Sequence, residues 1–194
     1  MRTNSIVYGD GEKKRARVEM AYLRADIYNA DEYAHGLCNQ IAELDEYKNA
    51  DTVLLYFPTK SEPDLTPLAK KVLQDSKELA LPISRPESCT LDFRAVNDLG
   101  ELHKGTYGIY EPDEIARHTV ISEKTLCIVP ALAVDRDGYR LGYGKGYYDR
   151  FLSSFAGVAV LPIHSSLVCE RLPRLETDIP IKIIVTETGA IRNK

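Results

Sequence analysis

The segment TLCIVPALAVDRDGYRLGYGKGYYDRFL, residues 125–152, decides which fold this chain can adopt. It begins with a continuous apolar run over residues 125–129 that ends at a proline, which is typical of a strand buried on both faces. A glycine-rich turn follows, and then a helix predicted at residues 147–155. A strand, a turn and a helix in this order are typical of an α/β fold. In such folds ligands bind beyond the carboxyl ends of the strands, which is where this turn lies.

The same pattern of strands and helices continues on both sides of this segment. We predict further strands at residues 52–57, 79–83, 91–96, 157–163 and 182–186, and helices at residues 12–29, 31–47 and 66–76. The first of these helices is basic, with Val18 and Tyr22 among its apolar positions. The alternation predicts an α/β three-layer sandwich, in which a mainly parallel sheet is flanked by helices on both faces. Because we find no internal repeat or linker, residues 1–194 are expected to form a single α/β domain.

Composition and charge argue against several classes of function. The net charge of −4 gives no reason to expect nucleic acid as a partner, so an anion site must rely on local basic residues. No stretch approaches the ~20 apolar residues of a membrane span, and the N-terminus lacks the apolar region of a signal peptide. We therefore expect no membrane association and a cytoplasmic location. The cysteines are far apart in the sequence and are expected to be reduced thiols: Cys38, Cys89, Cys127 and Cys169.

The glycine-rich turn within residues 140–149 is the strongest candidate for a functional site. Its three alternating glycines remove every second side chain, so backbone N–H groups can approach a ligand closely. A turn that leads into a helix also offers the positive end of the helix dipole to an anion, and Arg140 and Lys145 would neutralise a triphosphate. The spacing matches neither the P-loop nor the dinucleotide-binding fingerprint. A flexible surface turn is the alternative interpretation.

Other residues become candidates only if the fold brings them to this turn. Lys13 and Arg17 lie four positions apart on one helical face, where a solvated basic surface is the usual explanation. Asp149 would stabilise a helix dipole and Asp178 would form a turn, but side by side near a phosphate they could bind magnesium. Glu62 follows the first predicted strand, and turn formation is its alternative role. The histidines have neither metal-ligand spacing nor a serine or cysteine partner that would indicate a catalytic triad.

Taken in order along the chain, these motifs resemble the 5-formyltetrahydrofolate cyclo-ligase family, also called methenyltetrahydrofolate synthetases. The specific part of the match is VPALA at residues 129–133, then Asp135, then GYRLGYGKGYYDRFL at residues 138–152. The remaining matches gain weight from their order: Lys13 with Arg17, EPD at 62–64 followed by PL at 67–68, GIYEP at 108–112, LP at 172–173 with Asp178, and IVTE at 184–187.

Two positions depart from the family pattern. Leu65 stands where the family usually has threonine, which puts a hydroxyl contact at that position in doubt, although Thr66 is adjacent. Val134 stands where an aromatic residue is common, and we interpret this as a change in packing. Neither departure lies in the glycine-rich turn.

The resemblance implies ATP-dependent conversion of 5-formyltetrahydrofolate to 5,10-methenyltetrahydrofolate, with ATP and Mg²⁺ as cofactors. It assigns the nucleotide to Lys13, Lys14, Arg15, Ala16, Arg17, Arg140, Leu141, Gly142, Tyr143, Gly144, Lys145, Gly146, Tyr147 and Tyr148. It assigns the folate to Phe57, Glu62, Tyr143, Gly144, Lys145, Gly146 and Tyr147. Lys145 and Arg140 would be the catalytic residues, which stabilise the transferred phosphoryl group, and Asp149 and Asp178 would hold Mg²⁺.

Two other functions remain open at the level of sequence. One is a non-catalytic folate-binding module, and the other is a related α/β phosphosugar isomerase or CoA transferase. The basic helix and the run from Gly144 to Asp149 argue against the second. We expect a monomer whose partner is a small-molecule substrate, 5-formyltetrahydrofolate with or without a polyglutamate tail.

Overall fold

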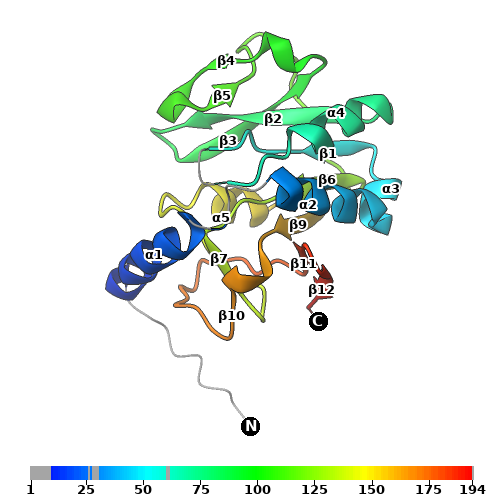
Figure 1. The fold of residues 1–194 in the computed structure, drawn as a ribbon. Coiled ribbons are helices and arrows are strands. Elements are labelled where there is room, and N and C mark those ends of the chain that lie inside the picture. Colours follow the sequence, from blue (N-terminus) through cyan, green and yellow to red (C-terminus); the bar gives the residue numbers. More distant parts are fainter. Residues whose placement is uncertain (1–9, 26, 28–30, 60–61, 194) are drawn as a thin grey trace.

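The structure is a computed structural model that describes residues 10–25, 27, 31–59 and 62–193, and a seven-stranded sheet forms its centre (Figure 1). The strands follow one another across the sheet in the order β12 (Gly189–Arg192), β11 (Ile183–Thr186), β9 (Val158–Pro162), β6 (Thr125–Ile128), β1 (Thr52–Leu54), β2 (Glu78–Arg85) and β3 (Thr90–Val96). The interior strands pair in parallel, and the two edge strands β12 and β3 are antiparallel to their neighbours. The predicted mainly parallel sheet is therefore confirmed.

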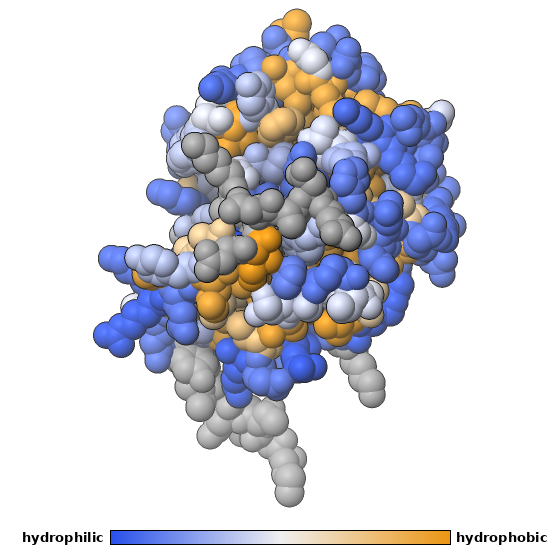
Figure 2. All heavy atoms as spheres, in the orientation of Figure 1, coloured by the Kyte–Doolittle hydropathy of each residue, from blue (hydrophilic) through white to orange (hydrophobic). Residues whose placement is uncertain are grey.

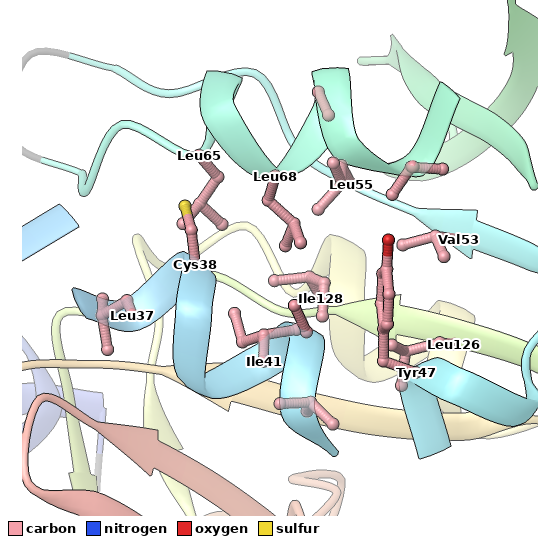
Figure 3. Close-up of a cluster of buried hydrophobic side chains, with 14 of the residues drawn as sticks. Leu37, Cys38, Ile41, Tyr47, Val53, Leu55, Leu65, Leu68, Leu126 and Ile128 are labelled. Carbon is pink, nitrogen blue, oxygen red and sulfur yellow. The ribbon is translucent and has the colours of Figure 1, made fainter. Parts of the chain in front are cut away.

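One face of the sheet is covered by the helices α2 (Asp31–Glu43), α3 (Asp45–Asn49) and α4 (Thr66–Gln74). Figure 3 shows Ile41 of α2 and Leu68 of α4 directed toward Ile128 of the sheet. The single helix predicted at residues 31–47 is in fact two, because Leu44 has an extended backbone (φ −63°, ψ 139°). This break turns Leu44 and Tyr47 into the core, where both are buried.

The opposite face packs against α5 (Tyr147–Leu152) and against loops that follow the strands. Side chains of β1 alternate between the two layers, since Val53 packs with the first set of helices and Leu54 packs with α5. This alternation follows from the two-residue period of a strand and explains why the predicted strands are apolar throughout. The predicted three-layer arrangement with helices on both faces is confirmed.

Several short elements were not predicted, and they surround the carboxyl ends of the strands. β7 (Ala133–Asp135) and β8 (Arg140–Leu141) lie in the long turn after β6, and they form a small second sheet with β10 (Val168–Cys169), which follows β9. A hairpin of β4 (His103–Lys104) and β5 (Tyr110–Glu111) extends beyond β2 and β3 (Figure 1). Three 3₁₀ turns complete the described elements: Leu99–Glu101, Thr106–Gly108 and Ser165–Leu167.

Helix α1 (Asp10–Ala25) extends from the body of the molecule beside α5 and β7 (Figure 1). It ends earlier than the predicted helix of residues 12–29, of which residues 26 and 28–29 lie outside the described part. Val18 and Tyr22, the apolar positions of the predicted helix, are exposed. The most buried side chains of the helix are polar: Lys13 and Arg24 are 4% and 1% exposed, and Arg24 donates a hydrogen bond to the carbonyl of Ala131. Ala16 and Met20 pack against the apolar clusters beside them, so polar and apolar contacts together hold this helix.

The order of the parallel strands fixes where a ligand can bind. β1 pairs with β2 on one side and with β6 on the other, and β6 also pairs with β9. After β1 the chain therefore passes to the β2 side of the sheet, and after β6 it passes to the β9 side. Such a switch point opens a crevice at the carboxyl ends of the strands. The predicted strand of residues 52–57 ends sooner, at Leu54, and Tyr56 and Phe57 leave the sheet to line this crevice.

The surface is mixed in character, and the cysteines are unpaired. The face shown in Figure 2 is largely hydrophilic, with apolar patches, one of which lies toward the end that carries β4 and β5. Among the described residues, none of the helices has both the length and the apolar composition to cross a membrane. All four cysteines are free thiols, as predicted.

Gly157→Ala tests how closely the chain packs against the backbone of β6 just before β9 begins. A Cβ atom at this position would lie 2.1 Å from the backbone oxygen of Thr125, so the backbone would have to shift. We expect the free energy of unfolding to fall by about 2 kcal/mol and the melting temperature to fall by roughly 4–8 °C. Gly36→Ala is the matched control, because Gly36 lies inside α2 and an added Cβ would meet no neighbouring atom within 4 Å. It should stabilise the protein by about 0.5–1 kcal/mol. Equal melting temperatures for the two variants would contradict this account.

Candidate active site

A cavity of about 870 Å³ occupies the crevice at the switch point, which is a size typical of small-molecule sites. Its walls come from α1, from the exit of β1, from the β4–β5 hairpin, from the glycine-rich turn and from the segment before β11. Most of the residues implied by the resemblance line it: Lys13, Arg17, Phe57, Glu62, Arg140, Gly142, Tyr143, Gly144, Lys145, Gly146, Tyr147, Tyr148, Asp149 and Asp178. The fold thus brings together residues from both ends of the chain.

Two guanidinium groups hold the glycine-rich turn by its carbonyl oxygens. Arg17 Nε donates to the carbonyl of Gly142 at 2.9 Å, and Arg150 Nη1 donates to the carbonyl of Lys145 at 2.8 Å. Gly144 and Gly146 have positive φ angles of 100° and 70°, which favour glycine. Because the arginines bind carbonyl oxygens of the turn, its shape is fixed by side chains from α1 and α5. Lys145 itself is exposed.

The predicted phosphate ligands and the predicted metal ligands form ion pairs with one another. Lys13 Nζ lies 2.5 Å from Asp178 Oδ2, and the two side chains are 6% and 8% exposed. Arg140 Nη2 lies 3.0 Å from Asp149 Oδ1, with side-chain exposures of 4% and 24%. The two pairs are neighbours, because the backbone N–H of Ile179 donates to Asp149 Oδ1. No feature of the sequence predicted this pairing.

Four residues of the expected nucleotide set do not line the cavity. Lys14 and Arg15 are exposed on α1, and Ala16 packs against a small cluster that includes the buried Leu141. Only the ends of the Lys13–Arg17 motif face the cavity, as expected for positions four residues apart on a helix. A nucleotide role for the other four stays a prediction from the resemblance.

The remaining wall of the cavity is aromatic, and much of it was not predicted. Phe57 packs against Tyr110 with ring centroids 5.1 Å apart, and the hydroxyl groups of Tyr107 and Tyr147 are 3.2 Å apart. Sequence reasoning missed Tyr56, Leu91, Tyr107, Ile109 and Tyr110, which also line the cavity. The GIYEP motif at residues 108–112 was noted only as a match, although its tyrosine was the available signal. Glu62 enters the cavity and accepts a hydrogen bond from the backbone of Thr59 at 2.8 Å.

Glu111 anchors the hairpin that carries these aromatic residues. Its side chain is buried, and its two oxygens accept hydrogen bonds from the backbone N–H groups of Ser84 and Thr106. At Gly105 a Cβ atom would lie 2.0 Å from Glu111 Oε2, so this turn requires glycine. The carboxylate therefore fixes the 3₁₀ turn in which Tyr107 has a left-handed backbone with φ 60°.

Two tyrosine hydroxyls of the cavity, those of Tyr147 and Tyr148, stay protonated at neutral pH. Burial raises the pKa of Tyr147 well above its usual value, and the hydrogen bond with Tyr107 raises it further. Burial also raises the pKa of Tyr148, with smaller contributions from the nearby Cys127 and Glu62. Both side chains are therefore neutral groups that can donate hydrogen bonds.

Asp149 and Asp178 suit a magnesium ion that a ligand helps to bind, and do not suit a cage made of protein alone. Among the described residues, no group of three or more His, Cys, Asp and Glu side chains is placed to hold a metal. Mg²⁺ bound with a nucleotide commonly takes one or two carboxylates and completes its shell with phosphate oxygens and water. Two carboxylates beside a basic glycine-rich turn fit that requirement.

A second buried carboxylate, Asp135, holds the backbone around the polar part of the site. It is fully buried and accepts hydrogen bonds from the backbone N–H groups of Asp137, Tyr139 and Leu172. Arg174 donates to it at 2.8 Å and lies over the ring of Tyr139. These contacts join the β7–β8 hairpin, which presents Arg140, to the segment that presents Asp178.

The two departures from the family pattern are packing positions. Leu65 is 1% exposed in the core beneath α4, and Val134 is fully buried against the α5 layer. Neither side chain lines the cavity. Val134 thus occupies a packing position, as interpreted, and Leu65 makes apolar contacts in the core.

Fold and cavity together define an α/β ligand-binding enzyme, in which a basic turn with paired carboxylates shares one cavity with an aromatic wall. The chain belongs to the 5-formyltetrahydrofolate cyclo-ligase family, whose model matches residues 10–187. The 5-formyltetrahydrofolate cyclo-ligase of Escherichia coli K12 is 32% identical over 142 residues, which cover 71% of this chain and 78% of that protein. The enzyme of the same name from Haemophilus influenzae is 24% identical over 178 residues, which cover 88% of this chain and 95% of that one.

Solved structures lead to the same family. The NMR structure of Aquifex aeolicus 5,10-methenyltetrahydrofolate synthetase is 37% identical, with a TM-score of 0.78 over 93% of this chain and 92% of that one. A 5,10-methenyltetrahydrofolate synthetase from Mycoplasma pneumoniae shares the fold, with a TM-score of 0.68 at 17% identity over 94% of this chain and 99% of that one.

Arg174→Met tests the support of the polar site by Asp135. The change leaves a fully buried carboxylate with backbone donors but without its guanidinium partner, so we expect the free energy of unfolding to fall by about 3 kcal/mol. Arg136→Met is the control, since Arg136 pairs with Glu170 and both side chains are largely exposed. It should change stability by no more than about 0.5 kcal/mol. Chemical denaturation measures both, and an equally small effect of Arg174→Met would rule out the supporting role.

Proposed function

We propose that this protein is an ATP-dependent 5-formyltetrahydrofolate cyclo-ligase, which forms 5,10-methenyltetrahydrofolate and releases ADP and phosphate. The observation that carries the proposal is the single cavity in which the basic glycine-rich turn and the aromatic wall meet. Such a cavity can hold a polyphosphate and a flat heterocycle in contact. Membership of the cyclo-ligase family supports the same reaction.

The chemistry of the reaction explains why these residue types suffice. A formamide carbonyl is a poor electrophile and its oxygen is a poor leaving group. Transfer of the γ-phosphoryl group from ATP to the formyl oxygen turns that oxygen into a good leaving group. N10 of the substrate then attacks the formyl carbon and loses its proton, the C–N bond forms, and the C–O bond breaks as phosphate leaves. The nucleophile belongs to the substrate, so the protein has to position two ligands and stabilise phosphate charge.

The basic residues of the cavity would bind the phosphates and stabilise their charge. Lys13, Arg17 and Arg140 would bind the phosphates from α1 and β8, and Lys145 would stabilise the charge on the transferred phosphoryl group. Their convergence on one cavity supports these roles. Asp149 and Asp178 would hold Mg²⁺, which when bound neutralises phosphate charge and favours transfer.

The aromatic wall and Glu62 would position the folate. Phe57 and Tyr110 already pack together and offer ring faces to a pterin, and Tyr143 and Tyr147 approach from the glycine-rich turn. Glu62 would accept hydrogen bonds from the polar edge of the pterin. A monomeric state, a cytoplasmic location and the use of polyglutamylated substrate stay predictions from the sequence.

The other two functions are less well supported. A non-catalytic folate-binding module would need the aromatic wall, but it would not need a basic turn and two ion-paired carboxylates in the same cavity. It would bind folate in calorimetry without hydrolysing ATP. A phosphosugar isomerase or CoA transferase would act without ATP, so nucleotide dependence separates it from a cyclo-ligase.

Lys145→Ala is the sharpest test of the assigned chemistry. The wild type should produce methenyltetrahydrofolate absorbance from 5-formyltetrahydrofolate only when both ATP and Mg²⁺ are present. Loss of one group that stabilises transition-state charge should lower kcat by about 10²–10³-fold. The melting temperature should not change, because Lys145 is exposed. Lys70→Ala, at an exposed lysine of α4 outside the cavity, should retain full turnover. A wild type that produces no methenyltetrahydrofolate absorbance would contradict the proposed function. A fully active Lys145→Ala variant would contradict the role assigned to Lys145.

Glu62→Gln tests the folate half of the cavity. Removal of a charged acceptor for the pterin should raise the KM for 5-formyltetrahydrofolate by about tenfold or more and leave the KM for ATP nearly unchanged. Asp64→Asn is the matched control, because Asp64 is exposed and bonds the backbone of Thr66 outside the cavity. An equal rise in both KM values would place Glu62 in general structural support rather than in folate binding.

A further inference from the structure

Each ion pair of the polar site joins a cation suited to bind phosphate with a carboxylate suited to bind a metal ion. Lys13 and Arg140 are suited to phosphate, and Asp178 and Asp149 are suited to a metal ion. In the structure each cation lies on a carboxylate, at 2.5 Å for Lys13 and Asp178 and at 3.0 Å for Arg140 and Asp149. Both cationic side chains are almost completely buried. Each pair is therefore neutral by itself and keeps both of its members from an incoming ion.

We propose that Lys13 is an internal counter-ion, which holds the metal-binding carboxylate of Asp178 until a nucleotide draws the lysine away. When magnesium and nucleotide arrive together, Lys13 passes from Asp178 to a phosphate and Asp178 passes to the metal. The exchange keeps every buried charge paired. It makes the binding of metal and of nucleotide cooperative, which deepens the proposed function and rests on it.

Either ion alone would leave a buried charge without its partner. A metal ion at Asp178 would displace Lys13 and place two positive charges side by side. A polyphosphate at Lys13 would leave Asp178 uncompensated beside more negative charge. Uncompensated buried charges are strongly unfavourable, so neither ion should bind tightly without the other.

The carboxylates can stay in place while their cations move. Asp178 Oδ2 also accepts a hydrogen bond from the backbone N–H of Leu175 at 2.7 Å, and Asp149 Oδ1 accepts one from Ile179 at 3.1 Å. Arg140 is held by a further hydrogen bond to the carbonyl of Ile179. Lys13 has a flexible four-carbon side chain, and its ammonium group donates hydrogen bonds to both carboxylate oxygens of Asp178. Lys13 is therefore the partner suited to move.

The proposal predicts an unusual sign for one substitution. Lys13→Met removes a positive charge that competes with the metal, so Mn²⁺ without nucleotide should bind the variant about tenfold more tightly than the wild type. The non-hydrolysable analogue AMP-PNP without metal should bind it more weakly, because a phosphate partner is lost. A residue that only supported the fold would not move the two affinities in opposite directions.

The experiment is a titration of Mn²⁺ in the absence of nucleotide, followed by electron paramagnetic resonance. Lys70→Met is the charge-matched control, because it removes the same charge from an exposed position of α4 outside the cavity lining. It should leave Mn²⁺ binding within about twofold of the wild type, since exposed charges are screened. Lys13→Arg, which keeps the charge, should bind Mn²⁺ as weakly as the wild type. Adding Asp178→Asn to Lys13→Met should abolish the gain.

Several outcomes would overturn the exchange. They are unchanged or weaker Mn²⁺ binding by Lys13→Met, an equal gain in Lys70→Met, and a gain that survives Asp178→Asn. Should Lys13→Met not fold, Lys13→Gln gives the same comparison with a polar side chain. Failure of the exchange can be distinguished from failure of the proposed function, because wild-type turnover is measured separately. If the wild type forms methenyltetrahydrofolate while Lys13→Met shows no gain in Mn²⁺ affinity, the proposed function stands and the proposed exchange is excluded.

Discussion

The position of β1 between β2 and β6 constrains the rest of the structure. Because these strands are parallel, the chain leaves β1 and β6 at the same end of the sheet. It then passes from β1 toward β2 on one side and from β6 toward β9 on the other. The crevice between the two exits needs walls that the sheet does not supply. Tyr56 and Phe57 provide one wall, and the long connection after β6 provides the other. The glycine-rich turn lies at the end of that connection, so its place follows from strand order.

Charge buried behind the cavity gives this irregular connection a fixed shape. The small sheet of β7, β8 and β10 is too short to be held by its own ladder, and Asp135 replaces the missing strand contacts with backbone and guanidinium donors. A buried carboxylate is destabilising unless it is fully bonded, but once bonded it specifies one arrangement of the chain. The same principle operates at Glu111, which fixes the turn that carries Tyr107. Both carboxylates hold loops, where backbone groups lack regular partners.

The sequence predicted the sheet and its two helical layers because short apolar runs, such as VLLYF at residues 53–57, alternate with segments of helical period. It could not predict β4, β5, β8 or β10, since two residues are too few to show a period. It also placed Val18 and Tyr22 on an apolar side of α1, whereas both are exposed and the most buried side chains of the helix are Lys13 and Arg24. Propensity does not reveal such contacts, because Lys13 and Asp178 are 165 positions apart and only the folded chain makes them neighbours. The site residues came from a motif match, and their pairing came from the fold.

The glycine-rich turn connects the two parts of the cavity mechanically. Its first carbonyl, at Gly142, is held by Arg17 of α1, and the residue after its last glycine, Tyr147, meets Tyr107 of the β4–β5 hairpin. If a phosphate displaced this glycine-rich segment, the Tyr147 hydroxyl group in the aromatic wall would move with it. Conversely, a ring bound against that wall would shift the glycine-rich segment. Reaction between two substrates requires their reacting atoms to be held at contact distance. One short segment that touches both binding regions meets that requirement without a separate moving domain.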